Sequence, residues 1–391
     1  MITIRTATDA DWPAIKLLVS IAFGSPTPDT VIDRIRAVTE TAFVAVDGDA
    51  VVGSTITMPL RMTVPGGKQV PVAGVSWVTV APTHRRRGLL RAMFTEQHRT
   101  FDAPFAALTA SEGGIYGRFG YGPATMVRDI RVDRRRAVVH PSVPDPGGVR
   151  MATADEARSA APAIYDRWQR RTPGAQAMPE AIWDRTFAGD DDPGTPDDKL
   201  LCLLHPDGFV LYRSNWTDDG SIAEIRKFCA CTDDAYVALW RTLLGLDLTR
   251  QIKSTVAEGD PLGLMLTDHR LVAAEDAYDK LWLRPMNVPA ALESRTYAAD
   301  LDTVVEVRDG FLDAGGTFAL TISDGQATCV PTDEPAVVTT DLDTIGMLFL
   351  GAHRATALAR ANRLRTKDFD VLQAIDAAFA TDPPAELGYG F

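Results

Sequence analysis

The chain has 391 residues, of which 46% are hydrophobic and 24% are charged, a composition typical of a globular protein of about two or three domains. Lysine and arginine number 40 against 52 aspartates and glutamates, and the resulting net charge of −12 argues against a general nucleic-acid-binding protein. The four cysteines include one C-x-C spacing without a second pair or a nearby histidine, which predicts buried reduced thiols and no zinc site.

The first 80 residues predict a strand, a helix and a series of antiparallel strands. Alternation over 2–5 predicts the strand, and residues 8–13 supply the caps and the early proline of the helix. The turn sequences D-G-D and P-G-G at 47–49 and 65–67 predict hairpins. The paired segments are 43–46 with 51–58 and 61–64 with 69–80.

The stretch Val75–Met93 combines a buried strand, an arginine-rich loop and a helix. Proline ends the strand at Ala81-Pro82-Thr83, and Arg85-Arg86-Arg87-Gly88 stands directly before apolar residues at helical spacing. Free N–H groups at a helix start and arginine side chains both favour an anion, so the stretch predicts a pyrophosphate site. The alternative is a surface helix with a solvated basic start. Neither the Walker loop nor the dinucleotide-binding glycine pattern is present.

Five glycines crowd the segment 111–122, which follows a predicted strand at 105–110. Such a density indicates unusual backbone dihedral angles or a close approach to another part of the molecule. Prolines and glycines at 134–150 then predict a boundary.

A second α/β unit follows the boundary, with a helix at 153–171, a hairpin at 201–213 and a helix at 234–248. Thr153 and Glu156 have the spacing of a capping box. The order resembles that of the first unit without its arginine loop. From about residue 287 the pattern changes again. It predicts strands at 303–307, 317–322 and 326–330, and helices at 344–350, 355–363 and 371–380.

The arginine loop fits the [RQ]-x-x-G-x-[GA] pattern of GNAT-fold N-acetyltransferases, except that Leu90 stands at the last position. Together with Ser111–Thr125, Asn287–Glu293 and the segments 351–354 and 362–368, it resembles the Eis (enhanced intracellular survival) family of bacterial N-acetyltransferases. This resemblance covers essentially the whole chain.

The resemblance implies an α+β chain of three domains. These are a catalytic GNAT domain at 1–133, a degenerate GNAT domain at 134–286, and a sterol-carrier-protein-like domain at 287–391 whose terminus completes the active site. It also implies a homohexamer, acetyl-CoA as donor, no metal, and primary amines as acceptors.

The resemblance further assigns roles to individual residues. Tyr116 would be the general acid, and the terminal carboxylate of Phe391 the general base. The backbone of Val78–Val80 would hold the acetyl and pantetheine end, and the arginine segment the pyrophosphate. The implied cofactor-binding residues are Val78, Thr79, Val80, Arg85, Arg86, Arg87, Gly88, Leu89, Leu90, Arg91, Ser111 and Glu112.

These roles suit acetyl transfer to an amine. An α-carboxylate with a pKa of about 3.3–3.7 is ionised and can accept a proton, and a tyrosine with a pKa of about 10 can donate one to the leaving thiolate. A strand N–H can stabilise the oxyanion. Tyr121, five residues further on, is the alternative acid, and residue types alone do not choose between the two. His84, beside the arginines, is expected to be solvated or close to phosphate rather than catalytic.

Phe23 and Trp77 would supply aromatic walls for the amine substrate. The substrate classes that the resemblance implies are aminoglycosides, lysine side chains and polyamines. Here Ser25 and Gly390 occupy positions where family members can carry acids. A less acidic pocket is therefore expected, with weaker use of polycationic aminoglycosides.

A second hypothesis is a non-catalytic lipid- or partner-binding protein with a vestigial GNAT site. The N-terminal residues show no signal-peptide pattern, and no apolar run reaches the roughly 18 residues of a membrane span. A cytoplasmic protein without nucleic-acid partners is therefore expected.

Overall fold

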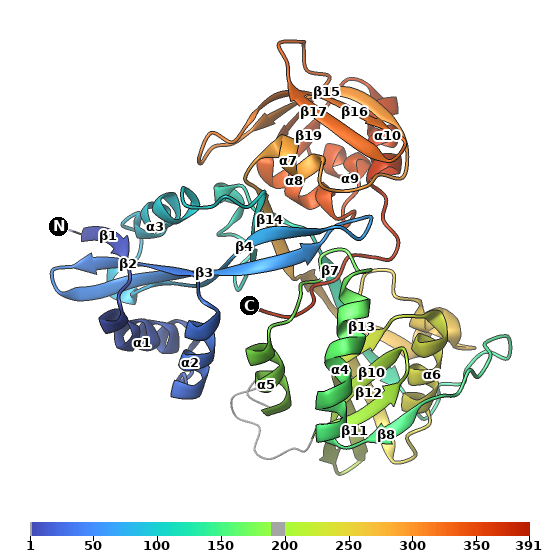
Figure 1. Cartoon of the computed structure of the whole chain (residues 1–391). Coiled ribbons are helices and arrows are strands. Elements are labelled where there is room, and N and C mark those ends of the chain that lie inside the picture. The colour runs from blue at the N-terminus through green and yellow to red at the C-terminus, as the bar shows by residue number, and fades with distance from the viewer. Residues whose placement is uncertain (1, 189–199) are drawn as a thin grey trace. The chain divides into compact units, whose positions relative to one another are not determined.

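The computed structural model describes residues 2–188 and 200–391, which form two compact units (Figure 1). The first unit contains the chain up to Thr125, the short segment Pro173–Ala181, and Lys280–Phe391. The second contains Met126–Thr172 and the described part of Ile182–Asp279. The predicted α+β class is confirmed, since three sheets are accompanied by helices.

The first unit begins with a seven-stranded sheet. Its spatial order is β1 (Ile2–Thr6), β2 (Thr41–Asp47), β3 (Ala50–Thr63), β4 (Gln69–Val80), β5 (Phe105–Thr109), β14 (Leu281–Pro285) and β6 (Gly122–Pro123). Its helices are α1 (Trp12–Phe23), α2 (Asp29–Val38) and α3 (Leu89–His98), with 3-10 turns η1 (Asp9–Asp11), η2 (Pro82–His84) and η3 (Gly117–Phe119). The sequence analysis missed α2, which buries Ile32 and Ile35.

Strand β4 is irregular around Trp77, next to the predicted cofactor-binding residues Val78–Val80. Trp77 has a φ of +48°, and the pairing with β3 shifts register between Ser54 and Ile56. Pairing with β5, the parallel neighbour, ends at Gly74. Among the described residues no strand pairs with β4 on this side after Gly74, so this edge of β4 has no strand partner from Val75 onward.

The second unit has its own seven-stranded sheet. Its spatial order is β13 (Val272–Asp279), β7 (Met126–Asp133), β12 (Thr249–Ala257), β11 (Gly220–Ala230), β10 (Gly208–Thr217), β9 (Leu201–His205) and β8 (Arg150–Ala152). The helical elements are α4 (Ala154–Gln169), α6 (Asp233–Leu244), η4 (Pro261–Met265), η5 (His269–Leu271) and all but the first two residues of α5 (Glu180–Ala188). The predicted capping box of α4 is present: Thr153 accepts the Glu156 N–H at 3.2 Å, and Glu156 accepts the Thr153 N–H at 2.8 Å.

The two sheets exchange strands. β7 follows β6 directly in the chain, but it pairs with β12 and β13 in the second sheet. β14 follows β13, but it pairs with β5 and β6 in the first. The domain limits 1–133, 134–286 and 287–391 divide the chain linearly and stay a prediction.

The C-terminal part of the first unit has a five-stranded sheet and four helices. The sheet order is β17 (Gln326–Pro331), β16 (Gly316–Ser323), β15 (Leu301–Arg308), β18 (Val338–Asp341) and β19 (Leu364–Arg365). The helices are α7 (Val288–Leu292), α8 (Leu342–Phe349), α9 (Ala355–Arg360) and α10 (Phe369–Phe379). No helix among residues 2–188 and 200–391 is long and apolar enough to cross a membrane.

The glycine-rich segment is explained by this C-terminal part. A Cβ atom at Gly122 would lie 1.9 Å from the carbonyl oxygen of Asp343 on α8. Gly346 of α8 faces the sheet in the same way, since its Cβ would lie 2.3 Å from the Leu283 carbonyl oxygen. The glycines therefore permit α8 to lie directly on the backbone of β6 and β14, the close approach that the sequence indicated.

Candidate active site

The loop before α3 presents backbone N–H groups to solvent. Arg86 and Gly88 both adopt left-handed backbone conformations, with φ of +62° and +79°. Gly88 is the N-cap, no side chain caps the helix, and no acidic residue lies in its first turn. The first N–H groups of α3 and the positive end of its dipole are thus open to an anion.

The arginines of this loop differ in their surroundings. Arg85, Arg86 and Arg87 are exposed, and none forms an ion pair or hydrogen bond with a described residue. Arg91, in the first turn of α3, lies with its guanidinium carbon 5.6 Å and 5.4 Å from the ring centres of Phe119 and Phe311. His84 is engaged elsewhere, with Nε2 3.3 Å from a carboxylate oxygen of Asp47.

Helix α6 of the second unit occupies the position that α3 has in the first, but its N-terminus is different. α6 also follows a strand that pairs in parallel with the next one, as α3 does. Its N-terminus is occupied, however, because the Thr232 hydroxyl accepts the Ala235 N–H at 3.2 Å and Asp233 and Asp234 fill the first turn. This helix start satisfies one of its own donors and repels anions, in contrast to the uncapped start of α3.

The open edge of β4 carries Val78, Thr79 and Val80. The Thr79 side chain is buried and bonded to Ser54, with 2.7 Å between the hydroxyl oxygens, so it contributes to the pairing of β3 and β4. Val78 packs against the aromatic cluster that contains Tyr116, and Leu90 of α3 packs there too. Ser111 and Glu112 are exposed just after β5. The strand edge, the helix start and the loop with Tyr116 therefore meet around one cluster.

Tyr116 has the properties of an undissociated proton donor. Its side chain is 8% exposed, and its hydroxyl makes no hydrogen bond to a described residue. Burial, with a smaller effect from the negative charge of Glu112, raises the pKa of Tyr116 to about 12. The phenol therefore remains protonated at neutral pH.

Tyr121, the alternative acid, is buried and already bonded. Its side chain is inaccessible to solvent, and its hydroxyl lies 2.7 Å from Nε2 of His98. Nδ1 of His98 lies 2.8 Å from the Phe94 carbonyl oxygen, so Nδ1 donates and Nε2 accepts from the tyrosine. Burial lowers the pKa of His98 to about 3 and raises that of Tyr121. This arrangement favours a structural role for Tyr121.

The C-terminal residue lies at the end of β5. The Thr109 hydroxyl donates to the Phe391 carbonyl oxygen at 3.2 Å, and the Phe391 ring packs against the core cluster that includes Phe105 and Ala107. Tyr389 is largely buried in the same cluster, and burial raises its pKa. The terminus is therefore docked.

The short segment Pro173–Ala181 holds this tail in place. Its Pro173 carbonyl accepts the Glu386 N–H at 2.9 Å, and the Gln176 side chain accepts the Gly388 N–H at 3.1 Å. The segment itself is bonded to β3, where Gly174 donates to the Thr63 carbonyl oxygen at 2.8 Å. Sequence reasoning missed Thr109 and Gln176 because no local pattern shows that residues more than 200 positions apart are neighbours.

The two aromatic residues expected to line the amine site have different surroundings. Phe23 ends α1 and is 54% exposed. Trp77 is half-buried and packs against the clusters beneath α1 and α2, which contain Ile15 and Ile35. A role for both in substrate binding stays a prediction.

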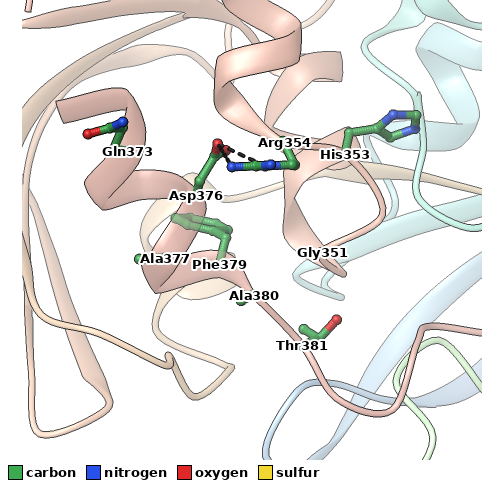
Figure 2. Close-up of a pocket in the computed structure, with 9 residues that line it drawn as sticks. All are labelled: Gly351, His353, Arg354, Gln373, Asp376, Ala377, Phe379, Ala380 and Thr381. Carbon is green, nitrogen blue, oxygen red and sulfur yellow. Dashed lines mark hydrogen bonds and ion pairs between the residues drawn. The ribbon is translucent and has the colours of Figure 1, made fainter. Parts of the chain in front are cut away.

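A separate hollow of about 510 Å³ lies in the C-terminal part (Figure 2). Its wall contains an ion pair in which Nε of Arg354 donates to Asp376 at 3.0 Å, and Asp376 also accepts from the Thr356 hydroxyl at 2.6 Å. The lining residues are Gly351, His353, Arg354, Gln373, Asp376, Ala377, Phe379, Ala380 and Thr381. Among the described residues no group of three or more histidine, cysteine or acidic side chains could hold a metal ion.

Comparison with known proteins confirms the predicted order of two GNAT domains followed by a sterol-carrier-protein-like domain. Acetyltransferase (GNAT) domain models match residues 3–124 and 174–285, and a sterol carrier protein domain model matches residues 288–386. The N-acetyltransferase Eis of Mycobacterium tuberculosis (strain ATCC 25177 / H37Ra) is 46% identical over 407 aligned residues, covering 100% of both chains. An uncharacterized N-acetyltransferase of Streptomyces avermitilis is 34% identical and covers 88% of each chain.

Solved structures show the same likeness. The crystal structure of Eis1 from Mycobacterium abscessus superposes with a TM-score of 0.89 at 30% identity, covering 100% of both chains. A GCN5-related N-acetyltransferase from Anabaena variabilis has a TM-score of 0.85 at 20% identity over 100% of both chains, a likeness of fold.

Proposed function

Because the chain belongs to the Eis family of GNAT N-acetyltransferases, we propose that it transfers the acetyl group of acetyl-CoA to a primary amine. The observation that carries this proposal is the docked C-terminus. The Phe391 backbone is bonded to Thr109 at the end of β5, the strand from which β4 diverges.

In the proposed site, each part of the reaction falls to a different element. The N–H groups at the start of α3, with Arg85, Arg86 and Arg87, bind the pyrophosphate of acetyl-CoA. The open edge of β4 at Val78–Val80 binds the pantetheine and offers an N–H to the oxyanion of the tetrahedral intermediate. Ser111 and Glu112 line the groove.

Proton transfer is assigned to Phe391 and Tyr116. The terminal carboxylate accepts a proton from the substrate ammonium, which frees the nitrogen lone pair to attack the thioester carbonyl carbon. The C–S bond then breaks as the oxyanion collapses, and the Tyr116 hydroxyl protonates the departing thiolate. The nitrogen gives up its second proton to form the neutral amide, and this proton restores the Tyr116 phenol. The raised pKa of Tyr116 keeps this proton on the phenol until sulfur acquires negative charge.

The test compares Tyr116→Phe with the wild type in an initial-rate thiol-release assay. Loss of a general acid should lower kcat by about 10²–10⁴-fold while acetyl-CoA binding, measured by the rise in melting temperature, stays unchanged. Tyr121→Phe is the matched control and should retain most activity. Full activity in Tyr116→Phe would overturn the assignment.

The base is tested by deleting Phe391, which should abolish turnover and leave acetyl-CoA binding intact. If saturating acetyl-CoA did not raise the melting temperature of the wild type, the alternative of a vestigial site in a lipid- or partner-binding protein would be favoured.

We propose small-molecule or peptide amines as substrates. Gly390 and Ser25 add no carboxylate to the pocket, so polycationic aminoglycosides should be weaker substrates than monoamines or lysine peptides. A panel of aminoglycosides, polyamines and lysine peptides in the thiol-release assay ranks them directly. A homohexamer in the cytoplasm and the three-domain division at 133/134 and 286/287 belong to the same proposal.

A further inference from the structure

A loop of the C-terminal part contacts α3, the helix whose N-terminus is proposed to bind acetyl-CoA. The loop follows β15, and its residue Phe311 packs against the aromatic cluster of the GNAT part. The Phe311 ring lies edge-on to Phe119, with ring centres 5.0 Å apart, and edge-on to His98 at 5.6 Å.

Asp309 fixes the shape of this loop. Its carboxylate accepts the backbone N–H groups of Phe311, Leu312 and Ala314 at 3.0, 3.2 and 3.0 Å. The same carboxylate receives both terminal nitrogens of Arg284, at 2.7 and 3.3 Å. Arg284 lies on β14 within the first sheet, and the two side chains are 0% and 1% exposed.

Arg284 also holds the turn that carries Tyr116. One of its terminal nitrogens donates to the Phe119 carbonyl oxygen at 2.7 Å, and the Phe119 N–H donates to the Tyr116 carbonyl oxygen at 2.9 Å. The ion pair therefore connects the loop of Phe311 with the turn of Phe119 through buried contacts.

Arg91 from α3 is exposed, and its guanidinium lies beside both rings. The guanidinium carbon lies 5.4 Å from the ring centre of Phe311 and 5.6 Å from that of Phe119, and the group makes no hydrogen bond to a described residue. A guanidinium held beside aromatic rings by cation–π attraction can keep N–H groups available to an anion. A long side chain that would otherwise sample many rotamers is thereby held in the first turn of α3.

We propose that Phe311 is a positioning residue for the acyl donor: it holds Arg91 against Phe119 so that the guanidinium edge meets the phosphates of acetyl-CoA. This inference rests on the proposed function. Phe311 would be a second contribution of the C-terminal part to the active site. It differs from the terminal carboxylate because Phe311 acts on the nucleotide end of the donor.

The test uses Phe311→Leu, which keeps an apolar side chain but removes the aromatic face. The dissociation constant of acetyl-CoA should rise about two- to fivefold, the range of one partly exposed cation–π contact, while kcat at saturation is unchanged. The dissociation constant of acetylpantetheine, which lacks the nucleotide phosphates, should not change. Phe369→Leu, at a 56% exposed position on α10, is the matched control.

A double-mutant cycle separates positioning from general loosening. Phe311→Leu should add nothing to the affinity loss already caused by Arg91→Ala. Additive losses, an unchanged acetyl-CoA affinity in Phe311→Leu, or an equal loss for acetylpantetheine would each overturn the inference. Failure of the wild type to bind acetyl-CoA would instead overturn the proposed function.

Discussion

Substitution Asp309→Asn should destabilise the first unit far more than a similar change at an exposed ion pair. The Arg284–Asp309 pair is 0% and 1% exposed, so the substitution leaves a buried guanidinium without its counter-charge. Removing one partner of such a pair costs about 3–5 kcal/mol in the free energy of unfolding. An asparagine side chain has one acceptor oxygen, so it can accept only some of the three backbone N–H groups that Asp309 binds. The expected loss of unfolding free energy therefore lies in this range.

The matched control is Asp341→Asn in the same part of the chain. Asp341 forms an ion pair with Arg308, with 3.3 Å between Oδ1 and Nε, but the Arg308 and Asp341 side chains are 46% and 52% exposed. Such surface pairs contribute about 0–1 kcal/mol to the free energy of unfolding. Because a chain of two units need not unfold in one step, urea titration should be followed by hydrogen exchange in peptides covering β14 and β15. Equal losses in the two variants would refute the reasoning.

Acid provides a second check on the same pair. Burial alone would raise the pKa of Asp309, but the hydrogen bonds and charge of Arg284 hold it below its ordinary value of 3.8. A lowered folded-state pKa stabilises the protein above pH 3.8, and this contribution is lost as the pH falls through the folded value. The stability difference between wild type and Asp309→Asn should therefore be constant near neutral pH and shrink below about pH 3.8.

Three further predictions concern the glycine-rich segment and its tyrosines. Gly120→Ala should prevent the native packing, because Gly120 has a φ of +80° and an added Cβ would lie 2.0 Å from a nitrogen of Arg284. Gly114→Ala is the control: an added Cβ there has no atom within 4 Å, so the melting temperature should equal that of the wild type. Tyr121→Phe should lower the unfolding free energy by about 1–3 kcal/mol, since His98 loses its partner, and a stability equal to the wild type would contradict that role. With a pKa of about 12 for Tyr116, the rate of the chemical step should show no alkaline decline near pH 10, and a decline there would argue against a buried acid.

Local patterns predicted most elements of the fold. The capping box of α4, the hairpin turns and the strand before the arginine loop each depend on neighbours in the sequence, and each was confirmed. Helix α2 was missed because it is short and follows a run of prolines and polar residues. The position of β14 in the first sheet was not predicted, since strand pairing across more than 150 residues leaves no local signal.

The candidate site shows the same division. The arginine loop was recognisable because residue type and spacing alone indicate an anion-binding helix start. Residue types left Tyr116 and Tyr121 equivalent, and only burial and the bond to His98 distinguish them. The contacts of Phe311 and Thr109 are tertiary, so no sequence pattern could have indicated them.

The exchange of β7 and β14 has a consequence for how the protein is made. During synthesis the N-terminal sheet lacks an internal strand until residue 285 has been translated, because β14 lies between β5 and β6. Meanwhile β7 must wait for β12 and β13 before it has neighbours. Neither GNAT sheet can therefore be completed before the other is nearly finished. A nascent chain must carry two open sheet edges through most of translation, and a fragment cut between the two domains would expose the same edges.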